Sequence, residues 1–239
     1  MSKKNILKVK KPLIILAGGF GTRLQSILKG NPKPLADING VPFLQLLFVK
    51  WVEQGFSNFI LSLHFEYDKI IKLVEELKKT ILVDCEVKFI VEATPLGTGG
   101  AVSFVVNELN LDGEIFIVNA DTWIESGYQM IDKEEGNFIG VVQIDDTNRY
   151  GKVVMDDTDK IVRFDEKNKN GSSGLINAGV YKLSTNIFAE WDGKAYSLER
   201  DLFPNLIHKK LLSGIELKTN FIDIGVPEDY LRFCSCRKI

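Results

Sequence analysis

The chain has 239 residues, of which 45% are hydrophobic and 26% are charged. This length fits one large α/β domain, and the composition excludes wholesale disorder, collagen-like repeats and a disulfide scaffold. The formal net charge of -2 offers no basic surface for a polyanion, so nucleic acid is disfavoured as a partner.

The sequence carries no sign of a membrane or an oxidising compartment. Its apolar runs are far shorter than the roughly 20 residues that cross a bilayer, and the run at residues 13–17 is too short for a signal peptide. The cysteines, Cys85, Cys234 and Cys236, are odd in number, which favours reduced thiols over disulfides. We therefore expect a cytoplasmic protein without a membrane partner.

Short apolar runs alternate with segments of helical period from residue 12 to about residue 144, after a basic, polar leader (1–11) that we expect to be loose. The alternation predicts a Rossmann-like, doubly wound α/β sheet, mixed but mostly parallel, with helices on both faces. The expected strands are 13–16, 59–61, 87–91, 115–118 and 138–142, and the expected helices are 43–53, 67–79 and 98–109.

The later part of the chain is richer in turns. The turn at 156–159 predicts a hairpin of strands 152–155 and 160–164, within a small β-rich insertion over the sheet at 145–174. Further strands are expected at 180–183 and 215–217, with a helix at 198–210 that Pro204 interrupts. No repeat or linker divides the sequence, which indicates a single domain over 1–239.

A glycine-rich segment follows the first expected strand. Residues 16–24 read Leu-Ala-Gly-Gly-Phe-Gly-Thr-Arg-Leu, and glycines allow backbone N–H groups to approach phosphate oxygens closely. The segment is not a dinucleotide fingerprint, because Leu24 stands where the third glycine belongs, and it lacks the Gly-Lys-Ser/Thr of a Walker loop. Phosphate binding and a tight strand-to-helix turn both remain open on spacing alone.

Two cations accompany this segment. Arg23 supplies a planar, permanently charged guanidinium, and Lys33 lies between Pro32 and Pro34, which restrict the backbone on either side. A stiffly held lysine favours a binding role, although an ordinary solvated lysine fits the same pattern.

The two motifs together resemble the signature of sugar-1-phosphate nucleotidyltransferases. The resemblance continues over nearly the whole chain, through residues 92–101, 119–121, 164–167, 177–181 and 221–227. The Pro-Leu-Gly-Thr-Gly-Gly-Ala run at 95–101 and the absence of a C-terminal β-helix domain are most similar to the D-glycero-α-D-manno-heptose 1-phosphate guanylyltransferases of bacterial surface-polysaccharide synthesis.

The resemblance implies an enzyme that transfers GMP from GTP to a sugar 1-phosphate, giving a GDP-sugar and pyrophosphate, with Mg²⁺ as cofactor. Two anions must meet in this reaction, so cations should carry most of the catalysis and no covalent enzyme intermediate is needed. The insertion would then bind the sugar. A homo-oligomer is compatible with the sequence, which does not fix the oligomeric state.

The resemblance also assigns residues to roles. Arg23, Lys33 and Asp121 would be catalytic, and Asp121 and Asp223 would hold Mg²⁺. The same aspartates could instead be turn or cap residues, which are common at strand ends. The nucleotide would be bound by Leu16, Ala17, Gly18, Gly19, Gly21, Thr22, Arg23, Glu92, Gly97 and Thr98, and the sugar phosphate by Glu166, Lys167, Asn177 and Gly179.

The sequence leaves alternatives open for the base and for the sugar. A carboxylate at Glu92 suits guanine, which offers adjacent N1–H and N2–H₂ donors, but Glu92 could merely end a strand. Asn168 stands where the family commonly has proline, which leaves the reach of Lys167 open. Alternatives are mannose 1-phosphate as acceptor, UTP, CTP or dTTP as donor, and a non-catalytic, nucleotide-sugar-binding regulatory protein. The missing third glycine disfavours a nicotinamide dehydrogenase.

Overall fold

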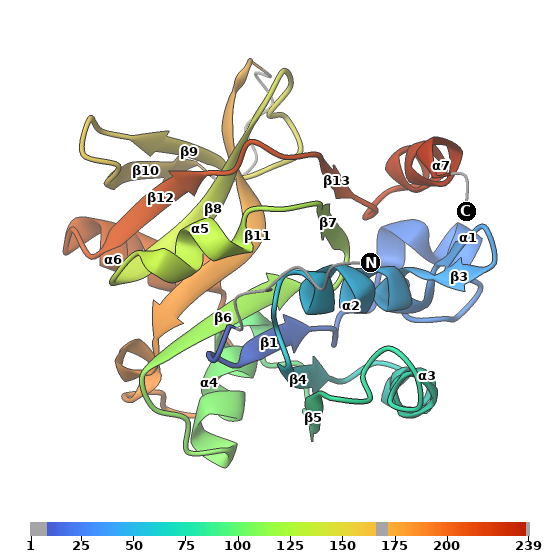
Figure 1. Cartoon of the computed structure of the whole chain (residues 1–239). Coiled ribbons are helices and arrows are strands. Elements are labelled where there is room, and N and C mark those ends of the chain that lie inside the picture. The colour runs from blue at the N-terminus through green and yellow to red at the C-terminus, as the bar shows by residue number, and fades with distance from the viewer. Residues whose placement is uncertain (1–8, 166–171, 238–239) are drawn as a thin grey trace, which may run out of the picture.

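The computed structural model describes residues 9–165 and 172–237. Within them, a nine-stranded mixed sheet has seven strands in the order β10-β9-β11-β6-β1-β4-β5 (Figure 1). The other two strands are β8, which pairs with β11, and β12, which pairs with β8. Its strands are β1 (Leu13–Leu16), β4 (Asn58–Leu63), β5 (Glu86–Val91), β6 (Glu114–Asn119), β8 (Asn137–Ile144), β9 (Lys152–Met155), β10 (Ile161–Asp165), β11 (Gly174–Ser184) and β12 (Leu212–Glu216). The described helices are α1 (Gln25–Leu28), α2 (Phe43–Glu53), α3 (Tyr67–Leu77), α4 (Gly97–Glu108), α5 (Tyr128–Lys133), α6 (Phe203–His208) and α7 (Pro227–Cys236).

The centre of the sheet is parallel. β1 pairs in parallel with both β4 and β6, and β4 pairs in parallel with β5. β11 then runs antiparallel to β6, so the sheet is mixed. The predicted fold class, a doubly wound α/β sheet, is confirmed.

Successive side chains of the central strands enter two different cores. Leu13 and Ile15 of β1 pack in one core with residues of α2 and α3, whereas Ile14 packs in the other with residues of α4 and α6. Figure 1 shows α2 and α4 on opposite sides of β1 and β6. A strand buried on both faces needs a continuous apolar run, which is why residues 13–16 carry no polar side chain.

The long strand β11 joins the two halves of the sheet. Its first half pairs with β8 and β9, and its second half with β6 and β8. The register with β8 shifts between Asn177 and Tyr181, around Gly179 at φ +69°. The predicted β-rich insertion is therefore continuous with the main sheet, because β9 and β10 extend it beyond β11.

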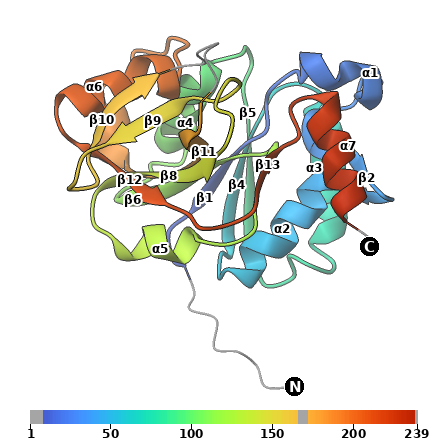
Figure 2. The same cartoon turned by 90° about the horizontal axis from the view of Figure 1, so that it is seen from above.

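Two small antiparallel ribbons lie beside the sheet. β2 (Asp37–Ile38) pairs with β3 (Val41–Pro42), and β7 (Thr122–Ile124) pairs with β13 (Phe221–Asp223). α7 follows β13 and lies beside β2 (Figure 2). In the β2–β3 hairpin, Asn39 Nδ2 donates a hydrogen bond of 2.9 Å to the Cys234 carbonyl of α7. The C-terminal helix is thus fixed to the β2–β3 hairpin of the N-terminal half.

Some sequence expectations need correction. The predicted loose leader is wrong for residues 9–11, because Val9 is buried beside Phe56 and Lys11 forms ion pairs with Glu114 and Asp132. The predicted helix at 198–210 is a π-helical turn (Leu198–Leu202) followed by α6, with Pro204 in the first turn of α6, where a proline is tolerated.

The sequence also predicts reduced cysteines and no membrane-spanning segment. The three cysteines are free thiols, as predicted. No helix among the described residues has the length and apolarity needed to cross a bilayer.

Candidate functional site

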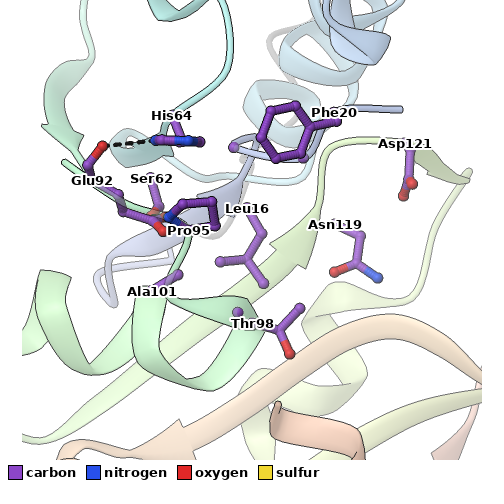
Figure 3. Close-up of a pocket in the computed structure, with 13 residues that line it drawn as sticks. Leu16, Phe20, Ser62, His64, Glu92, Pro95, Thr98, Ala101, Asn119 and Asp121 are labelled. Carbon is purple, nitrogen blue, oxygen red and sulfur yellow. Dashed lines mark hydrogen bonds between the residues drawn. The ribbon is translucent and has the colours of Figure 1, made fainter. Parts of the chain in front are cut away.

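A cavity of about 320 Å³ lies at the carboxyl ends of the four parallel strands. Leu16 ends β1, Ser62 lies near the end of β4, Glu92 follows β5 and Asn119 ends β6. Ligands of open α/β sheets bind at this edge. Figure 3 shows this first cavity, whose lining comprises Leu16, Gly18, Gly19, Phe20, Ser62, His64, Glu92, Pro95, Gly97, Thr98, Ala101, Asn119 and Asp121.

Glu92 is buried, and its carboxylate is held from two sides. Ser62 Oγ donates to Oε1 at 2.9 Å, and the Leu96 backbone N–H donates to Oε2 at 3.0 Å. His64 Nδ1 lies 2.9 Å from the Glu92 carbonyl oxygen, as the dashed line in Figure 3 marks. These contacts fix the segment that leads into α4 and leave each carboxylate oxygen one further acceptor site.

Aromatic rings line the mouth of the first cavity. The Phe20 ring lies edge-on to His64 at 5.7 Å between centroids, and 5.2 Å from the Phe65 ring. Phe20 is 45% exposed although it is large and apolar. A flat apolar ligand would therefore remove this ring from water.

A second cavity of about 200 Å³ adjoins the first, and Asn119 and Asp121 line both. It is more polar and lies where β11, the β7–β13 ribbon and the turn at 198–202 approach one another. Its lining comprises Arg23, Asn119, Asp121, Thr122, Arg149, Tyr150, Gly151, Phe164, Asn177, Gly179, Glu199, Phe221 and Asp223.

Opposite charges meet where the two cavities join. Lys33 Nζ donates to Asp121 Oδ2 at 2.6 Å. The β7–β13 ribbon brings Asp223 next to Asp121, because Asp223 pairs with Thr122 and the Ile224 N–H donates to the Asp121 carbonyl at 3.0 Å. Residues about 100 positions apart are thus neighbours, as the resemblance implied.

The two carboxylates have different electrostatic surroundings. Burial acts to raise the pKa of Asp121, but the Lys33 ammonium outweighs burial and the net pKa is lowered. Burial and the adjacent Asp121 carboxylate raise the pKa of Asp223 to about 6. The pKa of Lys33 is raised, since its attraction to Asp121 exceeds the cost of burial. Lys33 is therefore a cation at neutral pH.

Two glycines of the site allow close approaches that a side chain would block. Gly21 has φ +61°, and a Cβ there would lie 3.2 Å from Lys33 Cβ. Gly179 has φ +69°, and a Cβ there would lie 2.7 Å from Asn119 Nδ2. Both positions favour glycine for conformation and for space.

Most of the predicted site residues lie around the two cavities. Arg23, Asn177, Gly179 and Asp223 line the second cavity, and Asp121 lines both. The predicted nucleotide-binding residues in the first cavity are Leu16, Gly18, Gly19, Glu92, Gly97 and Thr98.

Several other predicted residues lie elsewhere. Ala17 is buried in the core, and Gly21 and Thr22 are outside the lining of both cavities. The predicted sugar-binding pair Glu166 and Lys167 lies outside the described residues.

Sequence reasoning missed part of the lining. Arg149 is the clearest case, because its guanidinium contacts Asp229 of α7 and the Tyr150 hydroxyl while it lines the second cavity. Asn119 is the last residue of β6, two positions before Asp121, and could have been found from that position. The other lining residues that the sequence analysis does not assign to the site are Phe20, Ser62, His64, Pro95, Ala101, Thr122, Tyr150, Gly151, Phe164, Glu199 and Phe221.

Comparison with known proteins gives relatives over nearly the whole chain. The D-glycero-alpha-D-manno-heptose 1-phosphate guanylyltransferase of Campylobacter jejuni is 36% identical over 223 residues, which cover 92% of this chain and 97% of that protein. The probable mannose-1-phosphate guanylyltransferase 1 of Oryza sativa is 32% identical over 229 residues, covering 91% of this chain but 62% of that protein.

Solved structures agree with this relationship. Crystal structures of HddC from Yersinia pseudotuberculosis are 36% identical and cover 95% of this chain and 100% of that chain, with a TM-score of 0.83 for one and 0.81 for its complex with GMP-PN. The model of the nucleotidyl transferase family matches residues 12–235. Enzymes of this family typically use a divalent metal. The chain, with its parallel strand ends and the paired cavities above them, belongs to the nucleotidyl transferase family.

Proposed function

We propose that the protein transfers GMP from GTP to D-glycero-α-D-manno-heptose 1-phosphate, releasing pyrophosphate and GDP-heptose for surface-polysaccharide synthesis. The Campylobacter jejuni relative carries this activity in its name, and it matches over nearly its full length. A nucleoside triphosphate substrate supports a cytoplasmic location.

The first cavity suits the nucleotide. Its apolar walls of Leu16, Pro95 and Ala101 fit a base, and the Glu92 carboxylate keeps acceptor capacity for guanine N1–H and N2–H₂. The backbone of Gly18 and Gly19 borders the same space, where N–H groups would bind phosphate oxygens. The solved complex of HddC with GMP-PN supports a guanine nucleotide as the ligand.

The charged junction suits the reacting phosphates. Lys33 is cationic, and Arg23 lines the cavity beside it. We infer that Lys33 exchanges its contact with Asp121 for the triphosphate when GTP binds. The residues present also fit Mg²⁺, since Asp121 and Asp223 are adjacent hard oxygen donors whose mutual repulsion is reflected in the raised pKa of Asp223. A cation held there would supply neutralising charge for the phosphate oxygens.

The second cavity suits the sugar phosphate. Asn177 and Gly179 lie at the β11 bulge, and Tyr150, Phe164 and Phe221 offer ring faces for the carbon atoms of a sugar. Glu166 and Lys167 remain proposed sugar-binding residues from the resemblance. Arg149, which also lines this cavity, adds a cation for the sugar phosphate.

The reaction then needs positioning more than covalent chemistry. An oxygen of the sugar 1-phosphate attacks the α-phosphorus of GTP, a new phosphorus–oxygen bond forms, and the bond to the bridging oxygen of the leaving pyrophosphate breaks. Arg23 and Lys33 offset the repulsion between the two anions and the charge that develops on the leaving group. The single observation that carries this proposal is the junction of the two cavities at Asn119 and Asp121, with Lys33 in contact with Asp121.

The test is pyrophosphate release with Mg²⁺ from GTP, ATP, UTP, CTP and dTTP, each paired with the 1-phosphates of D-glycero-α-D-manno-heptose, mannose and glucose. Release confined to GTP with the heptose phosphate is the expected result. Release with another pair would keep the reaction and correct the substrate. Silence in every pair, from folded protein that binds GTP, would favour a non-catalytic binding protein.

Mannose 1-phosphate is the second candidate acceptor. The Oryza sativa relative named for that substrate is 32% identical and matches over most of this chain. The two acceptors share the manno arrangement of ring hydroxyls, so the same assay separates them by the ratio of their kcat/KM values.

A further inference from the structure

A third cavity, of about 670 Å³, lies between β10 and α6. Figures 1 and 2 both show α6 beside β10, at the end of the sheet farthest from β5. The third cavity is larger than either cavity of the site, and Phe164 is the one described residue that it shares with them. Its lining comprises Asp156, Thr158, Lys160, Ile161, Val162, Arg163, Phe164, Pro204, Ile207, His208 and Lys210.

The lining of the third cavity is rich in positive charge. Among its described residues, three are cations, one is an imidazole and one is a carboxylate. They are, in that order, Lys160, Arg163, Lys210, His208 and Asp156. The whole chain has a formal net charge of -2, so the local excess of cations does not follow from composition. Cations gathered around one cavity favour a ligand of opposite charge.

The single carboxylate has a structural role. Asp156 Oδ1 accepts from the Thr158 N–H at 2.9 Å, from the Thr158 hydroxyl at 2.7 Å and from the Lys160 N–H at 3.1 Å. These hydrogen bonds shape the turn that joins β9 to β10. The fold therefore accounts for the one acidic residue of the lining.

The fold does not account for the cations in the same way. Lys160 Nζ donates to the Ser213 hydroxyl at 3.0 Å, which is a neutral partner. Arg163 Nε lies 2.8 Å from Asp165 Oδ2, and the two terminal NH₂ groups of the guanidinium remain for other acceptors. The ion pairs between described residues include neither Lys160 nor Lys210. Much of the positive charge is thus available to a ligand.

Lys210 occupies a backbone position that usually belongs to glycine. α6 ends in a Schellman motif, in which the Leu211 N–H donates to the Leu206 carbonyl at 2.8 Å. The residue before Leu211 is left-handed in this motif, and Lys210 there has φ +56°. A helix end also favours a cation, but Lys209 already supplies one. A residue that opposes the local preference is expected where its side chain has a function.

Apolar side chains complete the lining. Val162 is 52% exposed, Pro204 is also exposed, and Phe164 and Ile207 are half-buried. A ligand with an apolar body would remove this carbon surface from water. The volume lies within the range of about 300–1,000 Å³ that is typical of sites for small organic molecules.

These features together define a class of ligand. Several cations around one cavity suit a group with about two negative charges, as a phosphate monoester carries at neutral pH, and the planar guanidinium of Arg163 can bind its oxygens in pairs. We propose that the third cavity binds a phosphate monoester with an apolar body, with the phosphate on the cations and the body on Val162 and Pro204. This site is separate from the proposed catalytic site and does not depend on the reaction assigned there.

The test uses phenyl phosphate as the probe, titrated into the protein by calorimetry. Inorganic phosphate lacks the apolar body, and phenol lacks the charge. We expect phenyl phosphate to bind, inorganic phosphate to bind about tenfold more weakly, and phenol to give no measurable binding. Equal dissociation constants for phenyl phosphate and inorganic phosphate would contradict the proposed class of ligand.

Variants locate the bound probe. Arg163→Gln should raise the Kd of phenyl phosphate about tenfold, and it should fold normally because the Arg163 side chain is 63% exposed. The matched control is Lys209→Gln, a cation at the same helix end but outside the lining, which should leave Kd within about twofold. Arg23→Gln, in the second cavity, should also leave Kd within about twofold.

Lys210→Gly separates binding from stability. Glycine adopts the left-handed conformation without steric cost, so we expect Tm to rise by about 2–4 °C while the Kd of phenyl phosphate rises about tenfold. A Kd that is unchanged in both Arg163→Gln and Lys210→Gly would overturn the proposal. So would a Kd that rises only in Arg23→Gln, because the probe would then occupy the second cavity. Neither result bears on pyrophosphate release, which tests the proposed function separately.

Discussion

The two cavities are similar in position but differ in how the chain builds them. The first draws most of its lining from segments directly after parallel strands, namely residues 16–20, 62–64, 92–101 and 119–121. The second gathers residues from across the chain, between Arg23 and Asp223, and few of them follow a parallel strand. One half of the site thus depends on local sequence and the other on topology. Substitutions should separate these two dependences.

The largest effect is expected at Asp121, one of the two residues that line both cavities. Asp121→Asn removes a charge that would bind the cation and leaves Lys33 without its ion-pair partner. We expect kcat to fall on the order of a hundredfold or more, since electrostatic groups at a reacting phosphate act in the transition state. Steady-state pyrophosphate release measures this. Asp112→Asn, at an exposed aspartate before β6, is the control and should be fully active.

Gly179 tests how far the second cavity depends on topology. Gly179→Ala places a Cβ 2.7 Å from Asn119 Nδ2 at φ +69°. Gly193→Ala is its matched control, because Gly193 also has positive φ, +84°, but no heavy atom lies within 4 Å of the added Cβ. We expect both to lose about 1 kcal/mol of unfolding free energy from backbone strain. Gly179→Ala should lose at least about another 1 kcal/mol from the clash, with turnover down about tenfold.

Urea unfolding and turnover together decide this prediction. Equal stability losses in the two variants would mean that Asn119 moves aside freely, and that the approach of β11 to β6 does not constrain the junction. A loss of turnover in Gly193→Ala would mean that strain anywhere in the chain disturbs the site.

Ser62 tests how far the first cavity depends on local sequence. Ser62→Ala removes the hydrogen bond to Glu92 Oε1, which is buried and 2.9 Å long. A hydrogen bond to a charged group contributes about 1.5–3 kcal/mol, so the Glu92 carboxylate should lose part of its fixed orientation. We expect the preference for GTP over UTP, as a ratio of kcat/KM, to fall about fivefold. Ser103→Ala, at another fully buried serine, should lose stability without changing that ratio.

The effect expected at Arg149 is as small as that at Ser62. Asp229 of α7 forms ion pairs with both Arg149 and Arg232, but only Arg149 of these two lines the second cavity. The Arg149 side chain is 41% exposed, so solvent screens its charge. We expect Arg149→Gln to raise KM for the sugar 1-phosphate about fivefold and Arg232→Gln to leave it within twofold. Similar changes in both would indicate that Asp229 pairing, not the cavity, matters.

Sequence predicted the local half of the molecule well for a physical reason. A strand buried on both faces requires a continuous apolar run, and the turn that follows it requires glycine. Residues 13–19 show both patterns and therefore predict both the strand and the binding segment. The helices α2, α3 and α4 were predicted within about two residues, because amphipathic period is a strong signal. Lys33 was found because two prolines flank it.

The topological half could not be predicted in this way. β7 and β13 have three residues each, too few for a period, so their pairing and the approach of Asp223 to Asp121 had no local signal beyond the resemblance. Arg149 and Glu199 stand in ordinary polar surroundings in the sequence, and only folding brings them to the cavity. The single-domain organisation and the roles of the individual site residues stay predictions.

The central position of β1 has a consequence for motion. Its backbone is paired on both sides, by β4 and β6, and its side chains are nearly all inaccessible to water. Amide protons of Ile14 and Ile15 should therefore be among the last to exchange with deuterium, at a free energy close to that of global unfolding. The glycine-rich segment starts from this slowly exchanging strand. The nucleotide would therefore bind to a surface that is already ordered, and little of the binding free energy would be lost to ordering the chain.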